Sequence, residues 1–143
     1  MTRVTRETLV HKPASLVYSL LTHPAERAKW QSSFEEEALA GSLVVGSRIR
    51  AKRRGSTSGS TYEFLVTALT PDKRLGMDAL RNGQLVAATA FVLDARGDST
   101  HVRSEAELKL TGLQRILAPL VMGEMEKRMV VELAALKEFA EAN

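Results

Sequence analysis

The chain has 143 residues, of which 44% are hydrophobic and 26% charged, and its formal net charge is +3. This length and balance are typical of a soluble globular protein, so we expect a single domain over residues 1–143. No run of about eighteen apolar residues is present, which excludes a membrane-spanning helix, and the absence of cysteine excludes disulfides, thiolate metal sites and cysteine nucleophiles.

The opening residues, MTRVTRETLVHKP, alternate polar and apolar side chains. This pattern predicts an extended segment around Val4–Val10 and lacks the continuous apolar region of a secretory signal, so a cytoplasmic location is expected. Two short helices follow, each started by a proline at its first position, Pro13 and Pro24. The second of them ends at Trp30.

From Ser33 to Leu110 the apolar residues alternate with a period of two, which is typical of β-strands. The strands are predicted near Ser33–Ala40, Ser47–Arg54, Thr61–Leu69, Arg74–Leu80, Gln84–Leu93 and Thr100–Leu110. The links between them are short and rich in glycine, serine, aspartate or proline, as turns require. Short links between successive strands indicate an antiparallel meander.

Beyond Gly112 the spacing becomes helical, and the stretch Leu117–Phe139 predicts one long amphipathic helix. Pro119 and Gly123 disfavour helix interiors, so we expect them to kink or delay its start. The apolar stripe consists of Met122, Met125, Met129, Leu133, Leu136 and Ala140. The opposite face carries Glu124, Lys127, Arg128, Glu138 and Glu141.

Together these elements predict an α+β fold. A curved antiparallel sheet of six to seven strands would wrap around the long C-terminal helix, with the two short helices placed after the first strand. Because a strongly twisted sheet tends to leave space beneath a helix that crosses it, the arrangement favours a cavity between the two. The methionines of the stripe would then either fill gaps in a packed core or form an adaptable wall of that cavity.

Five stretches carry a more specific pattern: ETLVHKPASLVYSLLTHPAERAKW, VVGSRIR, YEFLVTALTPDKRLGM, ATAFVLDARGDSTHVRSEAEL and the closing AALKEFAEA. They resemble the polyketide cyclase/dehydrase-like branch of the START/Bet v 1-like (SRPBCC) superfamily. The resemblance implies a helix-grip fold with a pocket between sheet and helix, and it implies binding of lipids, polyketides or other apolar small molecules. It does not imply catalysis, because many members only bind or carry, and no catalytic motif of the family can be transferred to this chain.

The acidic and basic runs EEE and RIRAKRR fall on neighbouring predicted strands. A plausible register sets Glu37 opposite Arg50 and Glu35 opposite Lys52, which predicts cross-strand ion pairs on a solvated face. A nucleic-acid surface would instead need an unbalanced basic face flanked by stacking aromatic rings. No nucleic-acid partner is therefore expected.

The inward faces of the strands are mostly apolar, with small side chains at the centre. On this basis the residues expected to line a ligand site are Trp30, Phe34, Arg53, Tyr62, Phe64, Met77, Thr89, Phe91, Ser104, Leu117, Val121, Met122, Met125 and Met129. Ala68 and Leu85 are placed on the same inward face. Arg53 would orient ligand oxygens or, alternatively, pair with Glu36 at the sheet edge.

Neither the three histidines nor the acidic residues form a metal-binding motif, so no metal or cofactor is expected. Three functions remain open. The domain could bind a hydrophobic or aromatic small molecule in the cavity, act on such a molecule as a cyclase or dehydratase, or serve as a protein-interaction domain with a collapsed cavity. For the enzyme, Tyr62, Glu36 or Arg53 would polarise a carbonyl or move a proton. The chain is expected to be a monomer or a homodimer.

Overall fold

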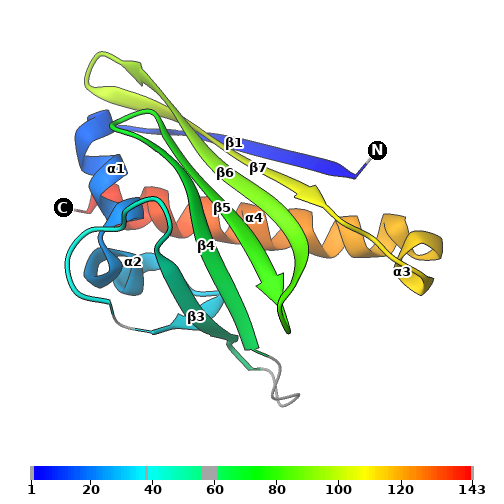
Figure 1. Ribbon diagram of the computed structural model, residues 1–143. Helices are drawn as coiled ribbons and strands as arrows, with labels where there is room; N and C mark the ends of the chain where they lie inside the picture. Colours follow the sequence, from blue (N-terminus) through cyan, green and yellow to red (C-terminus); the bar gives the residue numbers. More distant parts are fainter. Residues whose placement is uncertain (1, 38, 56–60, 143) are drawn as a thin grey trace.

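The computed structural model describes residues 2–37, 39–55 and 61–142 (Figure 1). Its elements, in chain order, are β1 (Arg3–Val10), α1 (Ala14–Thr22), α2 (Pro24–Trp30), β2 (Phe34–Glu36), β3 (Arg48–Arg53), β4 (Thr61–Thr70), β5 (Arg74–Arg81), β6 (Gln84–Arg96), β7 (Ser99–Leu108), α3 (Leu113–Ile116) and α4 (Ala118–Glu141). No helix among these residues is long and apolar enough to cross a membrane.

The seven strands form one antiparallel sheet in the order β1-β7-β6-β5-β4-β3-β2. The sheet curls around α4, and the short helices α1 and α2 lie together at the end where α4 finishes (Figure 1). The helix-grip α+β fold expected from the sequence is confirmed. Strand β1 pairs with β7, the last strand of the meander. All eight residues of β1 pair in continuous register, from Arg3 opposite Glu107 to Val10 opposite Thr100.

The core lies at the α1 end of the molecule. There the second half of α4 buries Leu133, Leu136 and Ala140, and α1 buries Val17 and Leu21 beneath it. The backbone of α4 approaches β1 and β7 but makes no comparable approach to β4, β5 or β6. The helix therefore crosses one side of the curled sheet, and it is α1 rather than α4 that approaches β5 and β6, at the α1 end of the molecule.

Two irregularities in the sheet correct the predicted inward faces. Between Val66 and Ala68 the pairing of β4 with β5 shifts by one residue, which places Leu69 opposite the buried Leu75. Ala68 therefore points outward, contrary to expectation. A β-bulge inserts one extra residue and reverses the in–out alternation beyond it.

The second shift lies in the pairing of β5 with β6, between Ala79 and Leu80. It moves Leu85, predicted to face inward, to a position with 37% exposure, while Val86 becomes partly buried. The alternation of polar and apolar residues does not predict such a shift, because the extra residue looks like any other strand residue.

The acidic strand is shorter than predicted, covering Phe34–Glu36 rather than Ser33–Ala40, of which Ala38 lies outside the described residues. The predicted register with β3 is confirmed: Glu35 lies opposite Lys52, and the Glu37 amide donates to the Arg50 carbonyl at 2.7 Å.

The ion pairs expected along this hairpin run differently. Glu35 pairs with Arg54 at 3.6 Å, and Arg48 pairs with Glu63 of β4. Both pairs join residues that are not direct cross-strand partners, because long side chains reach diagonal neighbours as easily as the residues facing them.

Candidate ligand pocket

A pocket of about 410 Å³ lies between the first half of α4 and the inner faces of β3 to β7. This volume falls within the range of roughly 300–1,000 Å³ that is usual for small-molecule sites. Its floor is made of small side chains on adjacent strands, where Ala79 faces Ala87 and Thr89 faces Ala106. Because alanine reaches only one carbon from the backbone, the sheet here cannot fill the distance to the helix.

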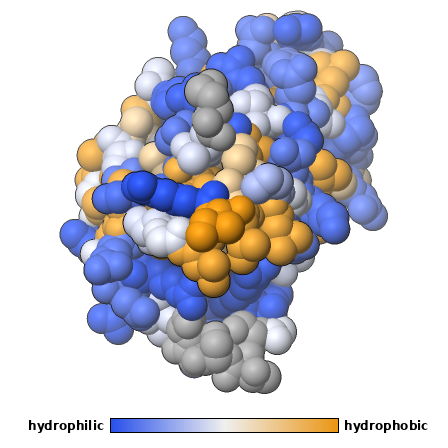
Figure 2. Space-filling view, turned by 90° about the vertical axis from the view of Figure 1, so that its right-hand side faces the viewer, coloured by the Kyte–Doolittle hydropathy of each residue, from blue (hydrophilic) through white to orange (hydrophobic). Residues whose placement is uncertain are grey.

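One side of the pocket is exposed. Figure 2 looks onto the side where α3 and the start of α4 lie, and it shows hydrophobic side chains gathered there. Leu113, Ile116 and Leu120 are 68%, 77% and 65% exposed. Leu120 also belongs to the pocket wall, so this apolar patch borders the pocket directly.

The wall is largely apolar and contributed by several elements. Phe64 comes from β4, Met77 from β5, Phe91 from β6, and Met125 and Met129 from α4. The rings pack edge to face: Phe34 lies 5.0 Å from Phe64 and 5.3 Å from Tyr62 between ring centroids. Edge-to-face contacts between aromatic rings hold them in fixed orientations, so this part of the wall is preformed.

A buried ion pair closes the α2 end of the pocket. The Arg27 guanidinium donates to both carboxylate oxygens of Glu36, at 2.8 and 3.1 Å, and to the Leu21 carbonyl at 3.1 Å. The two side chains are only 4% and 8% exposed. Glu36 was expected to pair with Arg53; it does not, because α2 brings Arg27 beneath the sheet while Arg53 lies opposite Phe34 and remains exposed.

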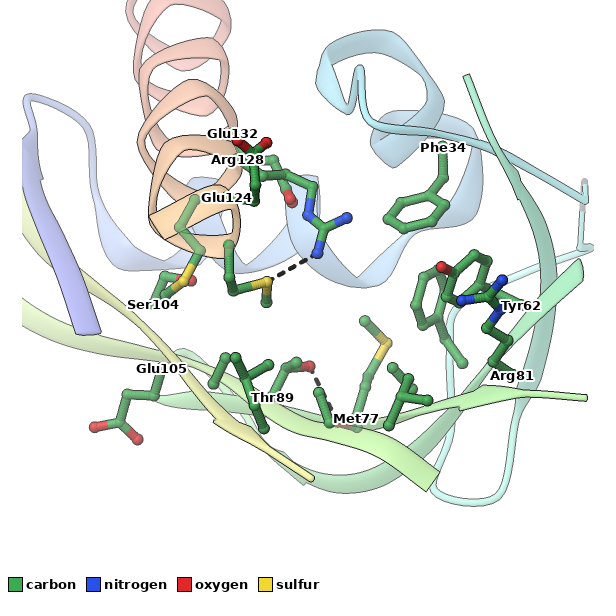
Figure 3. Close-up of a pocket in the computed structure, with 18 of the residues that line it drawn as sticks. Phe34, Tyr62, Met77, Arg81, Thr89, Ser104, Glu105, Glu124, Arg128 and Glu132 are labelled. Atoms are coloured by element: carbon green, nitrogen blue, oxygen red, sulfur yellow. Dashed lines mark hydrogen bonds between the residues drawn. The ribbon is translucent and has the colours of Figure 1, made fainter. Parts of the chain in front are cut away.

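Arg128 also reaches the pocket, although its sequence position suggested the solvent face of α4. It lies one turn beyond Met125, and its guanidinium extends into the space between α4 and Phe34 (Figure 3). The guanidinium carbon lies 5.6 Å from the Phe34 ring centroid, and Nη2 lies 2.9 Å from Met125 Sδ. Burial, reinforced by the charge of Arg53, lowers the pKa of Arg128.

Glu132 follows Arg128 by one turn and completes the polar side of the pocket. The Ser33 hydroxyl lies 3.4 Å from its carboxylate and can donate to it. Burial raises the pKa of Glu132, and the positive charges of Arg128 and Arg27 only partly oppose that effect. The pocket therefore contains a cation and a carboxyl group of raised pKa, close to each other on one helix.

Most of the residues expected at a ligand site are brought together by the fold. Those that line the pocket are Phe34, Arg53, Tyr62, Phe64, Met77, Thr89, Phe91, Ser104, Val121, Met125 and Met129. Three do not line it. Trp30 is 4% exposed and donates its indole N–H to the Leu20 carbonyl at 2.8 Å, Leu117 is 42% exposed, and Met122 packs on the core.

The expected and the observed lining residues differ because α4 crosses the sheet to one side. The surface of α4 that faces the interior is therefore wider than a single apolar stripe. Met129, Leu133 and Leu136 are buried, whereas Val121, Met125, Arg128 and Glu132 form a second row that faces the pocket. Spacings of four, three and four residues along this row are typical of one helical face, and they were the available signal for the two residues of this row that were missed, Arg128 and Glu132.

Among the described residues, no group of three or more histidine, cysteine, aspartate or glutamate side chains is arranged to hold a metal ion. The pocket combines few polar groups with a mostly apolar wall, which is typical of sites for small organic molecules.

The family of the chain is shown by its sequence. The model of the family described as Activator of Hsp90 ATPase homolog 1-like protein matches residues 11–140. The chain belongs to this family. Activator of Hsp90 ATPase homolog 1-like proteins are part of the SRPBCC, polyketide cyclase-like superfamily, which agrees with the resemblance seen in the sequence, and their helix-grip fold generally serves as a ligand-binding domain. No curated protein matches the chain.

Several solved structures have a similar fold. DynU16, from the dynemicin biosynthetic locus, has a TM-score of 0.73 at 16% identity over 99% of this chain and 48% of its own, so this chain spans about half of DynU16. The Aha1 dimer from Colwellia psychrerythraea has a TM-score of 0.74 at 22% identity, covering 96% and 95% of the two chains. CalU16 from Micromonospora echinospora has a TM-score of 0.67 at 18% identity, covering 96% and 73%. Identities this low show a shared fold only.

Proposed function

We propose that this protein binds a hydrophobic or aromatic small molecule in the pocket between α4 and the sheet. The observation that carries the proposal is the pocket itself, about 410 Å³ walled by residues such as Met77, Phe91 and Met125. Empty spaces much larger than a water molecule are rare in ordinary cores, because unfilled volume forfeits packing energy. A space of this size in a soluble domain supports a binding role.

The alternative of an interaction domain with a collapsed interior is less well supported, because that role would require α4 to seal against the sheet. The small floor residues Ala79, Ala87 and Ala106 prevent such sealing. Met125 and Met129 add flexible side chains that can adapt to ligands of different shape. Methionine at these two positions therefore gives the pocket a more adaptable wall than a branched residue, which would pack more rigidly.

Binding can be measured with N-phenyl-1-naphthylamine, a neutral dye whose fluorescence rises in apolar surroundings. We expect saturable binding to the unmodified protein. Met125→Trp should weaken it at least about tenfold, since the larger ring occupies the pocket. The matched control is Val131→Trp, which places the same ring on the exposed side of α4, where Val131 is 56% exposed. Equal affinity in all three proteins would show that the dye binds elsewhere and would remove the support for the pocket.

One observation favours a second candidate, an enzyme of the cyclase or dehydratase type. Glu132 is a carboxyl group of raised pKa beside the guanidinium of Arg128, an arrangement able to move a proton and stabilise a developing enolate. Benzoylacetone, a simple 1,3-diketone, provides a probe of this chemistry. If the protein is such an enzyme, it should accelerate the interconversion of benzoylacetone and its enol. Glu132→Gln should abolish this acceleration, while binding of the neutral dye persists. Unchanged rates with and without protein would leave the binding role alone.

A further inference from the structure

Arg128 is a half-buried cation that makes no direct ion pair with a carboxylate of the described residues. No carboxylate of the described chain lies within 4.0 Å of its guanidinium, although Glu124 and Glu132 occupy neighbouring turns of α4. Glu124 instead lies 3.9 Å from Lys127, and Glu132 is approached by Ser33. Placing a charge in a partly desolvated position without a direct ion pair costs free energy, and the nearby charges of Glu132 and Glu124 offset the effect of burial only in part.

The contacts that hold Arg128 orient its charge without neutralising it. Its guanidinium lies over the face of the Phe34 ring at 5.6 Å, and it touches the weakly accepting sulfur of Met125 at 2.9 Å. Phe34 is itself fixed by edge-to-face contacts with Tyr62 and Phe64. The guanidinium is thus set in place by neutral groups, and its remaining N–H donors face the interior of the pocket (Figure 3).

The charges around it are mixed. Arg53 also lines the pocket and its charge disfavours the protonated form of Arg128, whereas Glu132 and Glu124 each favour that form more weakly. An anion bound near Arg53 and Arg128 would relieve the repulsion between the two arginines. Arginine is suited to the task because its planar fork can donate two parallel hydrogen bonds to one carboxylate or sulfonate. On the sheet side of the pocket, Met77 and Phe91 are apolar.

We infer that the pocket selects acids: molecules with an apolar aromatic or aliphatic body that ends in a carboxylate or sulfonate bound by Arg128. The inference rests on the proposed binding function and names its ligand class. The body of the ligand lies along Met77, Phe91 and Met129. The anionic end accepts hydrogen bonds from the Arg128 guanidinium, which lies beside Phe34. Neutral molecules of the same shape enter the pocket but lose the charged hydrogen bonds.

A matched pair of dyes tests this inference. 1-Anilinonaphthalene-8-sulfonate and N-phenyl-1-naphthylamine share one ring skeleton and differ by the sulfonate. We expect Arg128→Met to weaken binding of the sulfonate dye by about tenfold or more, in line with the strength of hydrogen bonds to charged groups. Binding of the neutral dye should change less than about twofold, because methionine keeps an apolar side chain of similar reach. Lys127→Met is the control, since it removes the same charge from an exposed position on the same helix.

The outcomes separate the two proposals. A selective loss of the sulfonate dye in Arg128→Met, with no such loss in Lys127→Met, supports the acid-binding site. If both dyes lose affinity equally, or neither does, Arg128 does not recognise the charge of the sulfonate. The inference then fails, while the proposed binding function keeps its support. If the unmodified protein binds neither dye, the proposed function and the inference fail together.

A measurement on the unmodified protein decides the matter should Arg128→Met not fold. Decanoate and decanol are compared as competitors of the neutral dye. Decanol is the more hydrophobic of the two and would win in a pocket without a cation. We expect decanoate to displace the dye at the lower concentration. Stronger displacement by decanol would overturn the inference.

Discussion

At the scale of single residues, two arginines of the pocket illustrate how surroundings decide the role of one side-chain type. Arg27 is neutralised by Glu36 in a sealed position, where both partners are hydrogen-bonded and nearly inaccessible. The contacts described above for Arg128 are with an aromatic ring and a sulfur atom. The first arginine stabilises the end of the pocket, and the second is the residue that we propose binds the ligand.

The structural role of Arg27 leads to a stability prediction. Arg27→Met should lower the free energy of unfolding by about 3–5 kcal/mol, because it leaves the Glu36 carboxylate buried without its partner. Arg48→Met provides the contrast: its pair with Glu63 is exposed, with the arginine side chain 57% accessible, and the expected loss is below about 1 kcal/mol. Urea denaturation of both variants measures the difference. Losses of equal size would mean that the Arg27–Glu36 pair is not sealed from water.

Glu132 leads to a prediction of pH dependence. Burial raises its pKa in the folded protein above the ordinary value of 4.5. The folded state therefore holds this proton more tightly than the unfolded state does, so the contribution of Glu132 to stability is complete below pH 4.5 and is lost as the pH rises through the raised pKa. Glu132→Gln cannot ionise and should escape that loss.

The measurement is urea unfolding of the unmodified protein and Glu132→Gln between pH 4 and 8. The variant should gain stability relative to the unmodified protein as the pH rises from about 4.5, and the gain should level off once Glu132 is ionised in the folded protein. Glu138→Gln, on the exposed side of the same helix, is the control for removing one negative charge. Parallel curves for Glu132→Gln and the unmodified protein would contradict the burial of this carboxyl group.

At the scale of elements, the strands and the long helix could be predicted from the sequence because their patterns are regular. Alternating residues located most of the sheet, and the stripe from Met129 to Ala140 located the packed half of α4. The bulges near Thr67 and Val86 could not be predicted, because the extra residue of a bulge is of the same type as the ordinary residues of a strand. Arg128 was misplaced because a charged residue was assigned to solvent, whereas the offset of α4 gives the helix a second inward row.

Two glycines test the packing of these elements. In α4, a Cβ built at Gly123 meets nothing within 4 Å outside the helix's own backbone. Gly123→Ala should therefore stabilise the protein by about 0.5–1 kcal/mol, as alanine limits the unfolded chain and favours the helix. At Gly76 of β5, the added carbon would lie 3.2 Å from both Ala68 Cβ and Thr67 Oγ1.

Gly76→Ala should destabilise the protein by about 1–3 kcal/mol through overpacking, because the Cβ of Ala68 is fixed by its backbone and cannot rotate away from the added carbon. Thermal and urea unfolding of the two variants check both signs. A stabilised Gly76→Ala, or a destabilised Gly123→Ala, would show that the bulge or the pocket half of α4 is packed differently from this description.

At the scale of the whole molecule, the fold divides the length of α4 between two tasks. The end near α1 is a solid core in which Leu136 and Ala140 are fully inaccessible. The end near α3 leaves the helix standing away from the central strands, with the pocket beneath it and an apolar patch beside it. The helix is thus packed tightly at one end, and the other end contains the space that we propose holds a ligand. The presence of this division depends on where the helix crosses the sheet, which no local pattern of residues encodes.

The central claim is that the space between α4 and the sheet admits an apolar molecule. Crystals of the protein soaked in 2-bromonaphthalene test it most directly, because the anomalous signal of bromine reports the position of the guest. We predict a bromine peak inside the pocket, between Met125 of α4 and Met77 of β5. A peak confined to the outer patch near Leu113 and Ile116, or a crystal structure in which Met125 rests on the sheet with no space beneath it, would contradict the claim.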